Sequence, residues 1–281
     1  ISTNDLKPLN QVGALTSTVF TTAQGKIVDW VWALSLEDEL ILRLSPNRGK
    51  DLSNWISQFI IMEDVEIQNV SNAWTSLIIQ ENLGLNDIGL SLDLPGSQYR
   101  CMIDGFFFKT LRAYGERYEF IVKRDQVNKW CEKLCALGYV EAENTVLEEW
   151  RIRAGVPSPH SEFDAEINPL ELRLKDHYIS WTKGCYIGQE VISRLDSYDK
   201  LARIMMGFEC AETIPDDDSM RFRKDDKSIG RITSLLALEN GSMIGLGILK
   251  REHALAGVVE LSGASGKYEV ELVDRPFWSL T

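Results

Sequence analysis

The stretch Lys183-Gly184-Cys185-Tyr186-Ile187-Gly188-Gln189-Glu190 is the most informative segment of this 281-residue chain. Its glycines let the backbone turn sharply, or approach a ligand closely, on either side of the Cys-Tyr pair. Lys183 stands two residues before Cys185, and a nearby cation favours the thiolate, the form of cysteine that reacts or binds a metal. A core segment would not usually place Lys, Gln, Glu and Arg194 this close together. We therefore expect a functional loop here.

This octapeptide, with Arg194 behind it, resembles the signature of the YgfZ family. These are folate-binding proteins related to the T-protein (aminomethyltransferase) of the glycine cleavage system. Other segments resemble elements of the family in the same order along nearly the whole chain. They are Thr3-Asn4-Asp5, residues 23–29 (Ala-Gln-Gly-Lys-Ile-Val-Asp), residues 151–157 (Arg-Ile-Arg-Ala-Gly-Val-Pro) and residues 229–234 (Ile-Gly-Arg-Ile-Thr-Ser). The octapeptide is a specific signal, whereas the other segments support it mainly by their order.

Apolar spacing predicts a mixture of strands and helices in the first part of the chain. Residues 27–34 alternate as a strand does, which places Asp29 on the face opposite Trp30 and Trp32. Helical spacing is found at residues 52–59 and again at 127–137, where Gly138 ends the helix. Further strands are expected at 39–44, from Val65 and Ile67 onward, at 75–79, and as a hairpin of 105–111 with 118–122 around Tyr114-Gly115.

The last part of the chain is rich in short strand patterns separated by glycines. The candidate strands are residues 202–208, 229–238, 243–250, 258–262 and 268–273. This pattern is typical of a small barrel. We therefore divide the chain into an α+β region, residues 1–200, and a C-terminal β-barrel, residues 201–281. The resemblance implies the same class: a three-lobed T-protein-like α+β fold with two ferredoxin-like lobes and a barrel around a central channel.

The composition is that of an ordinary globular protein, with 44% hydrophobic and 26% charged residues. A net charge of −12 repels phosphate backbones, so we expect no direct nucleic-acid binding, although a local pocket for a small anion such as folate remains open. The five cysteines are odd in number and sparse, which favours a reducing compartment: bacterial cytoplasm or an organelle matrix. No apolar run reaches the length of a membrane helix, so no membrane partner is expected.

The chain opens with Ile1 rather than methionine. The family has a first strand and helix before its Thr-Asn-Asp segment. We therefore expect N-terminal residues, including any targeting segment, to be missing from this sequence.

Cys185 is the expected reactive group, with Lys183 and Tyr186 as its catalytic neighbours. A free cysteine is most often a buried structural thiol, but the glycines and Lys183 favour a functional one. The sequence leaves open whether it acts as a redox-sensitive thiolate, a transient metal or sulfur ligand, or a nucleophile. Tyr186 either packs in the core or stacks on a pterin ring.

The residues after the cysteine are expected to support the loop and its ligand. Gln189 and Glu190 suit the first turn of a helix. Glu190 and Arg194 are spaced to pair at i,i+4 and hold the loop in place. We include all three in the candidate folate-binding set.

Asn4, Asp5, Asp29 and Arg151 complete that candidate set. T-proteins carry an acidic pair after the glycine hairpin, but here Val28 precedes a single Asp29, which argues against aminomethyl transfer. Asn4 and Asp5 either bind the edge of a ligand ring or cap a local turn. Arg151 suits an anionic folate tail, although a surface arginine is an equally ordinary explanation.

The resemblance implies a protein that binds tetrahydrofolate or another reduced folate and supports iron–sulfur cluster assembly or repair, with an indirect effect on tRNA modification. Its partners would be iron–sulfur assembly proteins or cluster-containing client enzymes. One alternative is a folate-dependent aminomethyl or one-carbon transferase of the T-protein type. Another is a non-catalytic scaffold for cluster-assembly partners. The scattered histidines give no metal-ligand pattern, so no resident metal site is expected.

Overall fold

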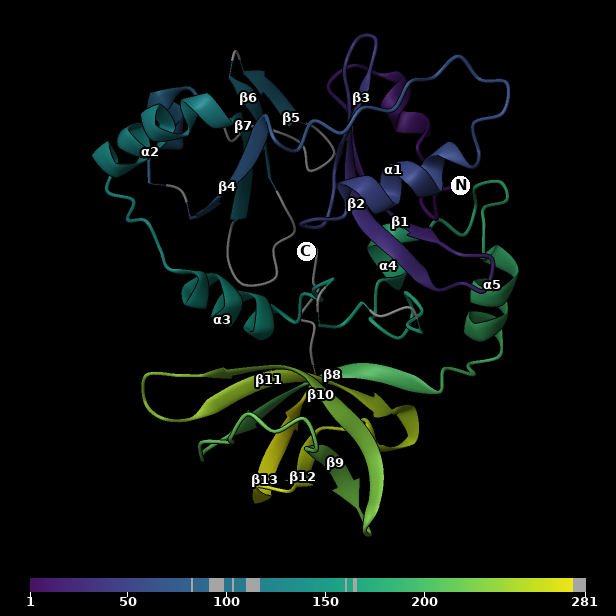
Figure 1. The fold of residues 1–281 in the computed structure, drawn as a ribbon, viewed down its shortest axis with the longest axis vertical. Coiled ribbons are helices and arrows are strands. Elements are labelled where there is room, and N and C mark those ends of the chain that lie inside the picture. Colours follow the sequence, from purple (N-terminus) through teal and green to yellow (C-terminus); the bar gives the residue numbers. More distant parts are fainter. Residues whose placement is uncertain are drawn as a thin grey trace.

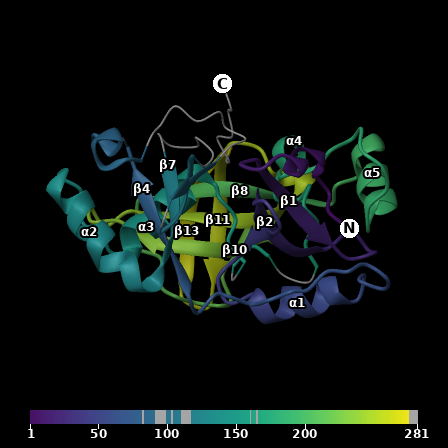
Figure 2. The ribbon, with the colours of Figure 1, turned by 90° about the horizontal axis from the view of Figure 1, so that it is seen from above.

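A computed structural model describes the chain except for residues 82, 91–98, 103, 110–116, 160, 164–165 and 275–281. Two α+β lobes lie side by side above a β-barrel, so the molecule has three lobes (Figure 1). Seen from above, the barrel extends beneath both upper lobes (Figure 2). The expected α+β fold with a C-terminal barrel is confirmed.

The first lobe is a three-stranded antiparallel sheet in the order β1-β2-β3. Its strands are β1 (Leu15–Thr21), β2 (Ile27–Ser35) and β3 (Leu40–Arg43), preceded by the 3₁₀ helix η1 (Lys7–Asn10). Helix α1 (Gly49–Ser57) covers one face, where Leu52 packs against Phe20 and Val31. The other face carries Trp30 and Trp32, as the alternation predicts.

One strand expected in this lobe does not form. Residues 63–70 follow α1 without strand structure, and none of the described strands pairs with them. Val65 is 60% exposed. The prediction of a strand here is wrong, because apolar alternation is not sufficient: a strand also needs a neighbouring strand to satisfy its backbone hydrogen bonds.

The second lobe is a four-stranded antiparallel sheet in the order β4-β7-β6-β5. The strands are β4 (Trp74–Gln80), β5 (Tyr99–Met102), β6 (Gly105–Lys109) and β7 (Arg117–Lys123), with 3₁₀ helices η2 (Leu85–Ile88) and η3 (Arg124–Gln126). Helix α2 (Val127–Ala136) packs Trp130 and Leu134 onto its outer face. The predicted hairpin is confirmed as β6 and β7, and its turn at Tyr114-Gly115 lies outside the described residues.

The inner faces of the two upper sheets meet at one end in an apolar core. Leu15 and Leu34 of the first sheet pack there with Phe106, Phe108 and Ile121 of the second. Because these side chains come from both sheets, they fix how the two lobes face each other.

The barrel closes in the order β10-β11-β8-β13-β12-β9. Its strands are β8 (Arg203–Cys210), β9 (Arg221–Lys224), β10 (Lys227–Ala237), β11 (Met243–Lys250), β12 (Gly257–Gly263) and β13 (Gly266–Val273), with η4 (Arg251–His253) between β11 and β12. The expected strands are present. Strand β9 escaped prediction because Phe222 is the one apolar residue among its four.

Helices α3 (Asn144–Ala154), α4 (Lys175–Tyr178) and α5 (Gln189–Ser197) link the lobes to the barrel. The first barrel strand begins at Arg203. We propose that the boundary between the α+β region and the barrel lies between residues 200 and 201.

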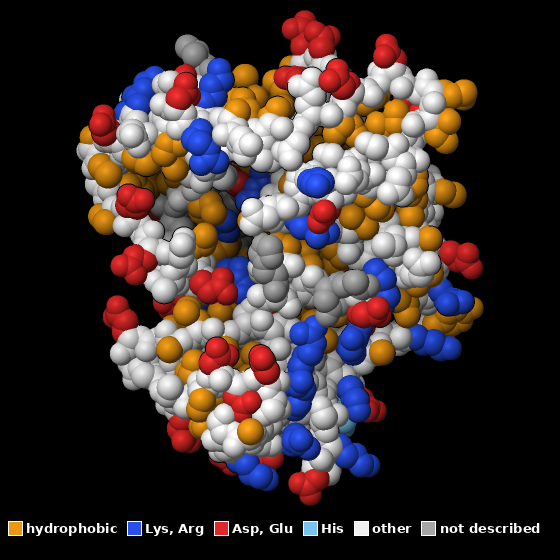
Figure 3. All heavy atoms as spheres, in the orientation of Figure 1, with side chains coloured by type: hydrophobic (Ala, Val, Ile, Leu, Met, Phe, Trp, Pro, Cys, Tyr) orange, Lys and Arg blue, Asp and Glu red, His pale blue; other side chains and the backbone are white. Residues whose placement is uncertain are grey.

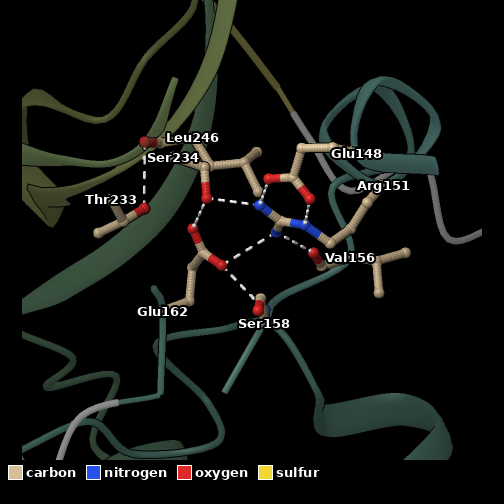
Figure 4. Close-up of polar contacts among 8 residues, drawn as sticks. All are labelled: Glu148, Arg151, Val156, Ser158, Glu162, Thr233, Ser234 and Leu246. Atoms are coloured by element: carbon tan, nitrogen blue, oxygen red, sulfur yellow. Dashed lines mark hydrogen bonds and ion pairs between the residues drawn. The ribbon is translucent and has the colours of Figure 1, made fainter. Parts of the chain in front are cut away.

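A buried arginine on α3 fastens the barrel to the α+β region (Figure 4). Arg151 donates to both carboxylate oxygens of Glu148 (2.8 and 2.5 Å), to Val156 O (2.7 Å), to Glu162 (3.0 Å) and to Ser234 Oγ on β10 (2.5 Å). These contacts use all five N–H donors of a guanidinium. Glu162, fully buried, also accepts from Ser234 Oγ (2.7 Å). The register shift between Ile232 and Ser234 is of the kind that re-aims a side chain out of a strand.

We expect Arg151→Met to lower the free energy of unfolding by about 3–5 kcal/mol, because it strands the buried Glu162 carboxylate without its cation. Arg251→Met is the matched control, since it removes an exposed arginine paired with Asp199 and should cost at most about 1 kcal/mol. Chemical denaturation of the variants measures both. Equal stability of the two variants would contradict the proposed fastening role.

Candidate functional site

Lys183 joins the cysteine loop to the N-terminal segment. Its Nζ donates to Ser2 O (2.7 Å), Asn4 O (3.1 Å) and Ser2 Oγ (3.3 Å), while the Ser180 N–H donates to Thr3 O (3.0 Å). Burial lowers the pKa of Lys183, and the charge of Asp5 partly opposes that shift. Two of the sequence motifs, far apart in the chain, thus form one structural unit.

The other end of the loop is held by the β1–β2 hairpin. Thr21 Oγ1 donates to Ile187 O at 2.5 Å. Gly188 precedes α5 with φ +83°, and a Cβ there would lie 2.5 Å from Thr22 O and 3.0 Å from Gly25 Cα. Only glycine allows this approach. By contrast, a Cβ at Gly184 would meet no atom within 4 Å.

Cys185 and Tyr186 face opposite environments. The Cys185 side chain is exposed to solvent. Tyr186 is 8% exposed and packs with Leu170, Ile179 and Ile192. Burial raises the pKa of Tyr186 to about 12, and its hydroxyl has no hydrogen-bond partner among the described residues. The structure therefore places Tyr186 in the core and leaves the thiol at the surface.

Gln189 supports the loop, but the ion pair expected behind it does not form. Gln189 Oε1 accepts from the Tyr186 N–H at 3.3 Å, closing the start of α5. Glu190 and Arg194 are both exposed, and among the described contacts they make no ion pair with each other. The expectation that this pair holds the loop is wrong: both side chains extend into solvent, where an ion pair stabilises little. Lys183 and Gly188 anchor the loop.

Asn4 and Asp5 shape a local turn, one of the two roles considered for them. Asn4 Nδ2 donates to Ser17 O (2.8 Å), and its Oδ1 accepts from the Asp5 N–H (2.9 Å). Asp5 Oδ1 accepts from the Lys7 N–H (3.0 Å). These contacts present the carbonyl of Asn4 to Lys183.

Asp29 lies on the face of β2 that α1 covers. Its cross-strand neighbour on β1 is Phe20, and its side chain is fully buried. Oδ1 accepts from the Trp30 N–H (2.8 Å). Burial raises the pKa of Asp29, and Ser45, Trp30 and Arg48 offset part of the shift. The structure does not bring Asp29 to the tryptophan face that borders the second lobe, so it does not converge with Asn4 and Asp5 on one ligand.

Arg151 is likewise engaged elsewhere. All five of its donors go to protein acceptors in the network that joins α3 to the barrel, so none is left for a folate tail. Surrounding carboxylates, not a ligand, satisfy this guanidinium. Arg151 is therefore a structural residue and does not belong to the ligand-binding set.

Sequence reasoning missed a polar cluster between the two upper sheets. Glu119 on β7 is buried, and its Oε1 accepts from Arg43 Nε (2.6 Å) on β3 and from Ser76 Oγ on β4. Burial alone would raise the pKa of Glu119, but Arg43, Ser76 and Arg117 outweigh it and leave that pKa lowered. The available signal was a single carboxylate in the strand Tyr118-Glu119-Phe120-Ile121-Val122, otherwise apolar and aromatic.

The surface between the two upper lobes is hollowed, and Lys and Arg side chains line part of that hollow (Figure 3). Aromatic side chains extend the polar cluster. Trp32 contacts Phe108 with ring centroids 5.9 Å apart, and the Arg117 guanidinium lies 4.2 Å from the Trp150 ring. Aromatic rings and charged groups from both lobes therefore border the same interface.

Within the described ranges, no three His, Cys, Asp or Glu side chains gather in a way that would hold a metal ion. The described helices also include none that is long and apolar enough to cross a membrane.

Gly188→Ala should destabilise the protein by at least about 1–2 kcal/mol, because alanine is strained at this φ and its Cβ meets the hairpin backbone. Gly184→Ala, four residues away in open space, should change stability by no more than about 0.5 kcal/mol. Thermal unfolding, together with the alkylation rate of Cys185, reports both effects. Equal behaviour of the two variants would show that Gly188 does not anchor the loop.

Asp29→Asn should stabilise the protein at neutral pH. Because burial raises the pKa of Asp29, the folded state binds its proton more tightly than the unfolded state, and the associated stability is lost as pH rises through that raised pKa. The variant's advantage should therefore disappear below about pH 4, where the unfolded carboxyl is also protonated. Melting temperatures from pH 3 to pH 8 test this, and a variant less stable at pH 7 would refute it.

Comparison with known proteins supports the fold. No family model matches the chain. A protein of Arabidopsis thaliana named "Putative transferase At1g60990, chloroplastic" is 28% identical over 252 residues, which is 85% of this chain. The chain spans 57% of the length of that relative.

A solved structure of a glycine cleavage protein superimposes on most of the chain. It is the glycine cleavage system aminomethyltransferase T from Bartonella henselae, with a TM-score of 0.76 and 15% sequence identity. The match covers 95% of this chain and 76% of the other. The chain therefore has the fold of aminomethyltransferase T.

Proposed function

We propose that this protein binds a reduced folate, such as tetrahydrofolate, and supports iron–sulfur cluster assembly or repair, as its resemblance to the YgfZ family implies. The observation that carries the proposal is the exposed Cys185 on a loop anchored at both ends. Lys183 ties one end to residues 2–4 and Gly188 packs the other against the hairpin. A fixed, accessible thiol suits reactive chemistry better than core packing.

The interface between the upper lobes supports the folate part of the proposal. Ligand sites are mostly apolar and carry a few convergent polar groups. Trp32 is only partly buried on the inner face of β2, next to its cross-strand partner Arg43 and the Phe108 ring, and Arg43 pairs with Glu119. Trp30, on the same face of β2, packs against Tyr178 instead. Flat rings beside a charged pair fit a pterin or benzoyl group with a carboxylate tail. The T-protein-like fold is consistent with this placement.

Cys185 would act at the surface on other proteins. The partners proposed are iron–sulfur assembly proteins or cluster-containing client enzymes, whose side chains can reach an exposed thiol. Effects on tRNA modification would follow indirectly, through modifying enzymes that carry clusters. A net charge of −12 agrees better with that route than with direct tRNA contact.

A folate-dependent transferase is the second candidate, and the name of the Arabidopsis relative favours it. The position of Asp29 speaks against aminomethyl transfer. Its carboxyl is buried under α1, on the face opposite Trp30 and Trp32, and Val28 stands beside it where an acidic pair would be expected. A non-catalytic scaffold is the third candidate, and it requires no role for the Cys185 thiol.

The chloroplast location in the relative's name is compatible with an organelle matrix. Bacterial cytoplasm is the other location that the sparse cysteines suit.

In cells that lack their own family member, this protein should restore the activity of an iron–sulfur enzyme under oxidative stress, and Cys185→Ala should not. Cys135→Ala is the matched control, because it removes another exposed thiol on α2 and should rescue fully. Enzyme activity is measured with equal amounts of each folded protein.

Full rescue by Cys185→Ala would refute the thiol role and favour the scaffold. If the well-folded wild-type protein fails to rescue, the cluster-maintenance role is wrong. Folate turnover would then be the assay for the transferase.

A further inference from the structure

Arg43 is fixed by a buried carboxylate and keeps donors turned toward solvent. Its Nε donates to Glu119 Oε1 at 2.6 Å, and Nη1 makes a long contact of 3.4 Å with Leu44 O. In the described part of the chain, Nη2 donates to no protein acceptor, and 27% of the side chain is exposed. An arginine held in this way presents N–H groups without having to order its side chain on binding.

The carboxylate behind Arg43 is itself well held. Glu119 is buried, accepts from Ser76 Oγ as well as from Arg43, and lies in the field of Arg117. Since these contacts outweigh burial, the pKa of Glu119 is lowered and the carboxylate stays ionised at neutral pH. The position of the Arg43 guanidinium is therefore set by the second lobe as well as the first.

Aromatic rings lie next to this guanidinium. Trp32 is the cross-strand partner of Arg43 on the β2–β3 pair, and Phe108 is the partner of Glu119 on the β6–β7 pair. The two rings also meet across the interface, with centroids 5.9 Å apart. An oriented cation thus borders a flat apolar surface built from both lobes.

We propose that Arg43 is a carboxylate-binding residue of the inter-lobe site, with Trp32 packing against the aromatic ring to which the carboxylate-bearing tail is attached. The free edge of a guanidinium matches a carboxylate in shape and charge. Arg151, the residue that the sequence favoured for this role, has no donor to spare. This inference rests on the proposed folate binding: the ligand class is a reduced folate, and its glutamate tail supplies the carboxylate.

The test uses calorimetric titration of the full chain with three probes. They are 5-formyltetrahydrofolate, the tail-less 6-methyltetrahydropterin, and 4-aminobenzoylglutamate, which has the tail without the pterin. Arg43→Gln should weaken binding of both tail-bearing probes by about tenfold to a hundredfold, the usual value of a charged hydrogen bond. Its affinity for the tail-less pterin should stay within about twofold of wild type.

Two further variants control for a nonspecific effect of removing an arginine and for a folding defect. Arg251→Gln, on an exposed arginine away from the interface, should leave all three affinities unchanged. If Arg43→Gln does not fold because Glu119 loses its cation, the double variant Arg43→Gln/Glu119→Gln keeps the buried pair neutral and is titrated in its place.

Unchanged affinity for the tail-bearing probes, or an equal loss for the tail-less pterin, would overturn the assignment of Arg43. Wild-type protein that binds none of the probes would overturn the proposed folate function and the inference together. Binding of 4-aminobenzoylglutamate that depends on Arg43, without any pterin binding, would support the carboxylate site while the folate proposal alone fails.

Discussion

The buried guanidinium of Arg151 is the contact on which the three-lobed arrangement depends. A cation removed from water is tolerable only when its donors are satisfied and its charge is balanced. Here the carboxylates of Glu148 and Glu162 balance the charge. Together with a backbone carbonyl and the Ser234 hydroxyl of the barrel, they accept all of the guanidinium's hydrogen bonds. Burial acts to lower the pKa of Arg151, but its bonds to Glu148 and Glu162 reverse that effect. The barrel therefore cannot shift on α3 without exposing unpaired charge.

Contacts between distant segments also account for the positions of the short sequence motifs. Arg151 of one motif meets Ser234 of another, Lys183 meets the segment around Asn4, and Gly188 meets the hairpin at Gly25. Each motif thus joins segments that are distant in the chain. Many residues of these motifs hold segments of the fold together, and Cys185 differs because its thiol is free and exposed and makes no hydrogen bond among the described residues.

Two regions with different chemistry result from this assembly. The cysteine loop is anchored at both ends to the first lobe and exposes the Cys185 thiol. On the inter-lobe surface, Trp32 lies beside Arg43, and Arg43 forms an ion pair with Glu119. Ser76 also donates to Glu119 and so stabilises its carboxylate. We propose contact with another protein for the first region and a small anionic ligand with a flat ring for the second.

The sequence by itself determined the fold class, most strands of the barrel and the alternation of β2. These follow from local periodicity and glycine placement, which depend on neighbours along the chain. The strand expected at Val65 failed because a strand needs a neighbouring strand that only packing supplies. The pairing of Glu190 with Arg194 failed although α5 places them one turn apart, because both side chains are exposed, where an ion pair stabilises little. Tertiary structure alone decided that Arg151 is saturated, that Asp29 faces α1 and that Arg43 meets Glu119. Those outcomes depend on which faces of distant strands come together, and no local pattern encodes that.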